Sequence, residues 1–197
     1  MGEYDKLFTH IDEHFDERLE KTRAYLRITG ISPTGEGIRE CAEATLDCIK
    51  ELGAEDARLV ETPGFPVAYG KIYSKNPNAK TLLVINNFDV MPAEEPDWVV
   101  PPFGAEIIDP ERIGMPSSLG KLLVARGSGD YKAPTMNFFH AMDTLLKVTG
   151  DVPVNIIFAI EGEEEIGSPH LRNFLDECYD DLKTADSGHF HGMRTEG

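Results

Sequence analysis

Apolar positions recur with helical spacing in several parts of the chain, and short apolar runs separate them. Spacings of three or four residues predict helices over 7–26, 38–52, 135–148 and 169–178. Runs rich in β-branched and aromatic residues predict strands at 57–61, 67–73, 81–85, 105–108, 121–125 and 154–160. This mixture of helices and strands predicts an α/β fold, a three-layer sandwich with a mixed, mostly parallel sheet.

The strand predicted at 154–160 is followed at once by a dense group of acidic residues. Asn155 is its one polar side chain, which is typical of a central strand buried on both faces. Four glutamates then follow, at Glu161, Glu163, Glu164 and Glu165. Open α/β sheets bind ligands at the carboxyl ends of their strands, and clustered carboxylates repel one another unless a cation or a proton is bound. A solvated acidic loop is the alternative interpretation.

Two further acidic residues stand at comparable places. Asp89 follows the strand predicted at 81–85, and Asp130 lies in the loop before the helix predicted at 135–148. In an α/β sheet these places meet the end of strand 154–160 at one edge. A divalent-metal site requires carboxylates or imidazoles from several elements, so this edge is a candidate metal site. Three unrelated polar loop ends are the alternative.

Composition narrows the class of protein. The 197 residues are 41% hydrophobic, enough for one domain with a core, and 35 acidic against 19 basic residues give a formal charge of −16. Such a charge disfavours nucleic acid and anionic membranes as partners and favours cations. No apolar run approaches the roughly 20 residues of a membrane span, and the acidic amino end lacks a secretory signal, so we expect a cytoplasmic protein. Three cysteines without metal or redox spacing predict buried free thiols.

Four motifs resemble those of a known enzyme family. They are NFDV at 87–90, Trp98 with PPF at 101–103, ARGSGDYK at 125–132 and EGEEEIGS at 161–168. In this order they resemble the co-catalytic zinc aminoacylase family, which includes acetylornithine deacetylase, succinyl-diaminopimelate desuccinylase, glutamate carboxypeptidase and carnosinase-like dipeptidases. The resemblance runs from about Ile11 to Asp186, the first part of a typical member. It implies that residues 1–197 form the amino-terminal portion of a catalytic domain, with the lid domain and the carboxyl-terminal catalytic part absent.

The resemblance also implies a set of site residues around two zinc ions, with manganese or cobalt as alternatives. The implied metal ligands are Asp130, Glu165, Asp186 and Asn87. Asp130 would bridge the two metals, Glu164 would act as the general base on a metal-activated water, and Asp89 would steady the ligand at position 87. Because neighbouring residues in an extended segment point in opposite directions, Glu164 and Glu165 can divide the roles of base and ligand.

The chain departs from the family pattern at three of these positions. Asn87 replaces the usual histidine, and an amide oxygen is a poorer zinc ligand that offers Asp89 no imidazole N–H. Tyr131 and Ala133 follow Asp130 where the family usually has an acidic residue or asparagine, and glycine. The resemblance also implies a cis peptide after Asp130. We therefore expect weak metal binding.

A second imidazole is expected to be missing, because the family's last histidine ligand follows the lid. His189 and His191 are candidates to replace it, and a solvated tail is the alternative. We expect Arg126 to pair with a nearby carboxylate, and Lys132 to lie on the surface or cap that network. The remaining histidines are interpreted as surface or ordinary helix positions, at His10, His14, His140 and His170.

The resemblance implies a metal-dependent hydrolase of amide bonds in dipeptides or N-acyl amino acids. The alternative is a catalytically silent relative or fragment that keeps the fold and binds metal weakly at most. The expected partners are a small peptide or an N-acyl amino acid. A sheet left incomplete in the manner implied would also expose a strand edge, through which we expect the chain to form a homo-oligomer.

Overall fold

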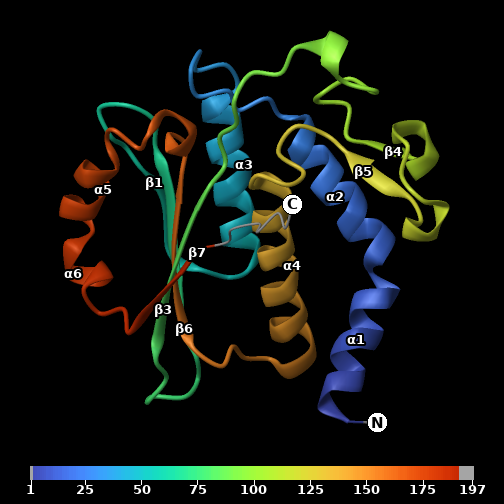
Figure 1. Cartoon of the computed structure of the whole chain (residues 1–197). Coiled ribbons are helices and arrows are strands. Elements are labelled where there is room, and N and C mark those ends of the chain that lie inside the picture. The colour runs from blue at the N-terminus through green and yellow to red at the C-terminus, as the bar shows by residue number, and fades with distance from the viewer. Residues whose placement is uncertain (1, 191–197) are drawn as a thin grey trace.

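The computed structural model describes residues 2–190 and places a five-stranded sheet between two layers of helices (Figure 1). The strand order is β1-β2-β6-β3-β7. The strands are β1 Glu55–Val60, β2 Val67–Ile72, β3 Thr81–Asn87, β6 Asn155–Glu161 and β7 Ser187–Phe190. Strand β3 runs parallel to β6 and β7, whereas β2 runs antiparallel to β1 and β6. The predicted α/β sandwich with a mixed sheet is confirmed.

Helices cover both faces of this sheet. Helices α3 (Ile38–Glu51) and α4 (Lys132–Thr149) lie on one face, and α5 (Leu171–Glu177) and α6 (Tyr179–Leu182) lie on the other. On the α4 side the ring of Phe139 packs against that of Phe158, with centroids 5.7 Å apart. Burying each such side chain stabilises the fold by about 1.5–3 kcal/mol. The helical layers therefore hold the strands, and the residues at their ends, in fixed positions.

The remaining elements lie outside the three layers. Helices α1 (Glu3–Glu13) and α2 (Phe15–Arg27) pack against α4, where Arg18 and Asp143 form an ion pair of 3.1 Å. Strands β4 (Glu106–Ile108) and β5 (Leu122–Val124) form a separate two-stranded sheet. No helix within residues 2–190 combines the length and apolarity that crossing a membrane requires.

Strand β6 is the central strand that its composition predicts. It hydrogen-bonds with β2 on one side and with β3 on the other, and residues 156–160 are all buried. Apolar side chains at consecutive positions suit this place because helices cover both faces. The strand ends at Glu161, whose side chain is also buried.

The single opening helix expected over 7–26 is wrong, because the chain breaks it at His14. The His14 backbone leaves the helical region, and its N–H bonds to Ile11 O at 3.3 Å. Its ring Nδ1 donates to His10 O at 2.9 Å, the carbonyl that a continuous helix would pair with the His14 N–H. A side chain thus takes the place of a backbone donor and separates α1 from α2.

Strand β7 was not among the predicted strands. Residues 187–190 pair in parallel with Leu82–Ile85 of β3, and the His189 ring stacks on Phe138 with centroids 5.8 Å apart. His189 is therefore part of the sheet rather than of a solvated tail. The prediction that His191 could replace the missing ligand concerns a residue outside the described range. Within residues 2–190, the outer edge of β7 carries no neighbouring strand.

Candidate metal and catalytic site

Two parallel strands end side by side and bring the acidic positions together. In the β3–β6 register Asn87 lies opposite Glu161, and the Phe88 N–H extends the pairing to Glu161 O at 2.9 Å. The residues after both strands therefore share the carboxyl edge of the sheet. On the β6 side, residues 164–166 form a short 3₁₀ turn, η4.

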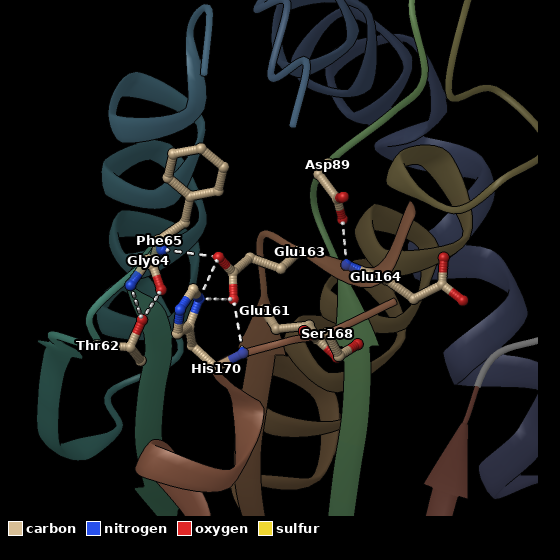
Figure 2. Close-up of polar contacts among 9 residues, drawn as sticks. All are labelled: Thr62, Gly64, Phe65, Asp89, Glu161, Glu163, Glu164, Ser168 and His170. Carbon is tan, nitrogen blue, oxygen red and sulfur yellow. Dashed lines mark hydrogen bonds and ion pairs between the residues drawn. The ribbon is translucent and has the colours of Figure 1, made fainter. Parts of the chain in front are cut away.

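Asp89 organises this edge. It is fully buried; its Oδ1 accepts the Glu164 N–H at 3.2 Å and its Oδ2 accepts the Glu165 N–H at 3.0 Å (Figure 2 shows the contact with Glu164). Burial raises the pKa of Asp89, and the hydrogen bonds from Glu165 and Asn87 oppose that shift. Hydrogen bonds to a carboxylate are stronger than neutral ones, so Asp89 fixes the backbone of both glutamates.

The Asn87 amide also serves Asp89. Its Nδ2 donates to Asp89 Oδ1 at 3.2 Å and lies 3.3 Å from Asp89 O, so an amide N–H takes the place of the absent imidazole N–H. The Asn87 Oδ1 atom is buried and has no hydrogen-bond partner among the described residues. A buried oxygen without a partner is costly, and a cation is one ligand that satisfies it.

Carboxylates from three elements lie within electrostatic reach of one another. Burial, followed by the charges of Asp130, Asp89 and Glu164, raises the pKa of Glu165 to about 7, while Arg126 opposes the shift. Burial, then Asp89 and Asp130, also raises the pKa of Glu164. A positive ion placed among these groups would reverse both shifts, because it stabilises the ionised carboxylates.

The structure does not bring Asp186 to this group, although the resemblance implies a metal ligand at this position. It precedes β7 and lies beside the first residue of β3: its Oδ2 accepts the Thr81 N–H at 2.9 Å and its Oδ1 pairs with Lys80 Nζ at 2.7 Å. Six residue steps along β3 separate Thr81 from Asn87, or roughly 20 Å. Asp186 therefore belongs to the amino edge of the sheet.

Three other expectations near the site have clear outcomes. The peptide bond between Asp130 and Tyr131 is cis, as the resemblance implies. Lys132 is not on the surface: it is fully buried, with its Nζ donating to Ile28 O at 2.5 Å and lying over the Tyr25 ring.

Arg126 forms no ion pair with a carboxylate in the part of the chain that the structure describes. It donates to Pro92 O at 3.2 Å instead, and its guanidinium lies 5.5 Å from the centre of the Trp98 ring. Trp98 thus packs in its loop against Arg126.

The polar groups gathered at this edge are oxygen donors. Across residues 2–190 no group of three or more His, Cys, Asp or Glu side chains is arranged to hold a metal ion. What the edge offers is the carboxylates of Asp130 and Glu165 together with the unpartnered Asn87 Oδ1. Carboxylate and amide oxygens suit hard divalent cations such as manganese better than they suit zinc.

A three-layer α/β sandwich with carboxylates gathered at the carboxyl edge of its central strands is an architecture of metallopeptidases. The sequence model of Peptidase family M20/M25/M40 matches residues 83–192, and the chain belongs to this family.

Individual relatives agree with this assignment. The chain is 28% identical over 186 residues to the Cys-Gly metallodipeptidase dug1 of Schizosaccharomyces pombe, covering 87% of this chain and 36% of that protein. The solved structure of an M20 metallo-carboxypeptidase, Sso-CP2 of Sulfolobus solfataricus, is 36% identical with a TM-score of 0.77, covering 90% of this chain and 37% of that one. Human carnosine dipeptidase 1 shares the fold, with a TM-score of 0.84 at 24% identity over 99% of this chain and 42% of that one. The chain thus spans about a third of the length of the curated relatives it matches.

Proposed function

We propose that this chain is the amino-terminal portion, residues 1–197, of the catalytic domain of a metal-dependent hydrolase acting on amide bonds in dipeptides or N-acyl amino acids. One observation carries the proposal: Asp89 holds the Asn87 amide and the backbone of both Glu164 and Glu165 at one edge of the sheet. Names of relatives, a Cys-Gly metallodipeptidase and a Beta-Ala-His dipeptidase, support small peptides as substrates. A cytoplasmic location is part of the same proposal.

The residues that would hold a divalent cation are Asp130, Glu165 and Asn87, the last through Oδ1. A bound cation, zinc or manganese or cobalt, supplies a water of lowered pKa and polarises the scissile carbonyl. Glu164 is the base: its carboxylate takes one proton from the water as the water oxygen attacks the carbonyl carbon. Glu164 then gives that proton to the amine nitrogen as the C–N bond breaks.

Two observations favour a second candidate function, a catalytically silent relative that keeps the fold and binds a cation weakly at most. Asn87 stands where the family has an imidazole, and Asp186 lies at the opposite edge of the sheet. Metal content after purification without chelator separates the two candidates. A stoichiometric divalent metal supports the hydrolase, and a metal-free protein that takes up none supports the silent relative.

Two isosteric variants test the division of roles between the adjacent glutamates. Glu164→Gln should abolish hydrolysis of Cys-Gly and β-Ala-His while changing manganese affinity by no more than about twofold, because the base is not a ligand. Glu165→Gln should lose both hydrolysis and metal binding. The measurements are a ninhydrin assay of released amine and a calorimetric titration of each variant. Equal losses of metal affinity in the two variants would contradict the assignment.

A further inference from the structure

Glu163 lies between the candidate-site residues and the rest of the fold, and it is buried, with 4% of its surface exposed. Its Oε1 accepts the Phe65 N–H at 3.2 Å and lies 2.9 Å from His170 Nδ1 (Figure 2). Its Oε2 accepts the His170 backbone N–H at 3.2 Å. An ionised carboxylate only accepts, so the ring Nδ1–H of His170 is the donor. Glu163 therefore joins the acidic segment to two other elements.

The first of these elements is the turn between β1 and β2, which is shaped to fit over the pair. Thr62 Oγ1 donates to Phe65 O at 2.7 Å and accepts the Gly64 N–H at 3.1 Å, which closes the turn. A Cβ atom at position 64 would lie 2.0 Å from Glu163 Oε1 and 2.3 Å from His170 Nδ1. Glycine is thus required for the turn to approach the carboxylate and the imidazole.

The second element is the segment that leads into α5. The Glu163 carbonyl accepts the N–H of Ile166 at 3.1 Å and of Ser168 at 2.8 Å, so the chain folds back on itself before His170. Ser168 Oγ also donates to Glu161 Oε1 at 2.8 Å. These bonds close the segment 161–170 into a compact loop whose middle is η4.

Two buried carboxylates hold η4 and the residue that precedes it. Asp89, after β3, receives the N–H groups of Glu164 and Glu165, and Glu163 receives those of Phe65 and His170. In Figure 2 the Glu163 side chain points toward the β1–β2 turn, and the Glu164 side chain points away from it. With Asp89 alone, η4 would be held only by the two N–H bonds to that residue. The bonds of Glu163 to Phe65 and His170 also fix the orientation of η4.

We propose that Glu163 and His170 are positioning residues for the candidate site. The pair fixes the orientation of η4 and so directs Glu164 and Glu165 toward Asp130. It acts through the backbone and does not touch the reacting groups. The roles of the two directed glutamates rest on the proposed function, whereas the positioning itself is a property of the fold.

The test compares three variants of the full chain. Glu163→Met removes both acceptor oxygens at similar length. Glu163→Gln keeps one acceptor oxygen, so only one of the two backbone N–H groups, Phe65 or His170, keeps its partner, and its NH2 group can donate to Nδ1 of the other His170 tautomer. Glu61→Gln is the matched control: it precedes the same turn, and Arg39 binds its exposed carboxylate at 2.7 and 2.9 Å. Amide hydrogen exchange at Glu164 and Glu165 is followed by NMR, and manganese affinity by calorimetry.

We expect Glu163→Met to speed exchange of the Glu164 and Glu165 amides at least tenfold, with the change confined to 161–170 and the turn 62–65. Manganese affinity should fall about tenfold or more. Glu163→Gln should give changes between those of Glu163→Met and the unmodified chain, and Glu61→Gln should match the unmodified chain. Unchanged exchange at Glu164 and Glu165 in a folded Glu163→Met protein would overturn the proposal.

A second variant keeps the test decisive if Glu163→Met does not fold. Gly64→Ala leaves both polar partners in the chain and pushes a methyl group against them, so it should speed the same two amides. Normal exchange in Gly64→Ala would overturn the proposal in the same way. If the unmodified chain binds no manganese, the proposed function fails, and the exchange measurement still decides whether Glu163 and His170 position η4.

Discussion

Replacing Asn87 with histidine tests the candidate site most directly. Asn87 is fully buried, its Nδ2 donates to Asp89 at 3.2 Å, and its Oδ1 has no partner among the described residues. A neutral imidazole has one N–H group and one unprotonated nitrogen. Its N–H can keep the hydrogen bond to Asp89, and its unprotonated nitrogen can act as a metal ligand where Asn87 Oδ1 lies.

The expected gain follows from ligand chemistry. Imidazole is a good zinc ligand, whereas an amide oxygen is a weak one, and even residues that only orient a ligand change metal affinity by roughly 10–100-fold. We therefore expect Asn87→His to tighten zinc binding about tenfold or more, equivalent to about 1.4 kcal/mol. Manganese prefers oxygen ligands and should gain less, so the zinc-to-manganese preference should rise.

The assay is a calorimetric titration of both forms with each metal at one pH. Asn78→His is the control, because Asn78 is exposed in the turn before β3, at the far end of that strand. Equal zinc affinities for the unmodified chain and Asn87→His would refute the reasoning and remove position 87 from the site. An equal gain in Asn78→His would show that any added histidine suffices.

Three further predictions concern the protonation of Glu161, the outer edge of β7 and the three cysteine thiols. Burial raises the pKa of Glu161 to about 7. The contribution of Glu161 to the free energy of unfolding is therefore fully present below its ordinary pKa of 4.5 and is lost as the pH rises through 7. For this reason Glu161→Gln should raise the melting temperature of the metal-free chain more at pH 8 than at pH 5. Sedimentation should show self-association through the edge of β7 that has no neighbouring strand within residues 2–190. This association should grow with salt, because salt screens the −16 charge, and a monomer at every salt concentration would exclude it. The three buried cysteines should resist Ellman's reagent until the protein unfolds, since burial raises the pKa of the Cys48 thiol to about 11; prompt reaction of the native chain would contradict their burial.

The parts of the fold that could be predicted are those in which the order of apolar and polar residues within one short segment indicates the structure. A run such as 156–160, with no polar side chain, has one stable place in a layered protein, between two helical layers, and β6 occupies it. Asp89 and Glu164 could be brought together because parallel neighbouring strands end at the same edge, whatever the details of their loops.

The parts that could not be predicted depend on contacts between distant residues. Strand β7 has four residues with no apolar alternation, and its pairing with β3 alone makes it a strand. The bond between Glu163 and His170 joins two side chains seven positions apart. Nothing in the run of glutamates distinguishes Glu163, which faces inward to the β1–β2 turn, from Glu164, which faces the candidate site.

The placement of Asp186 depends on the direction of β7, which the sequence motif does not contain. A carboxylate that begins a strand parallel to β3 lies at the amino edge, however well its spacing matches a family ligand, and Asp186 there binds Thr81 and Lys80. A ligand that β7 supplied to the Asp89 edge would have to follow Phe190 in the sequence, because β7 and β3 run in the same direction. Within residues 2–190, therefore, the candidate site draws its donors from the ends of β3 and β6 and from the loop before α4.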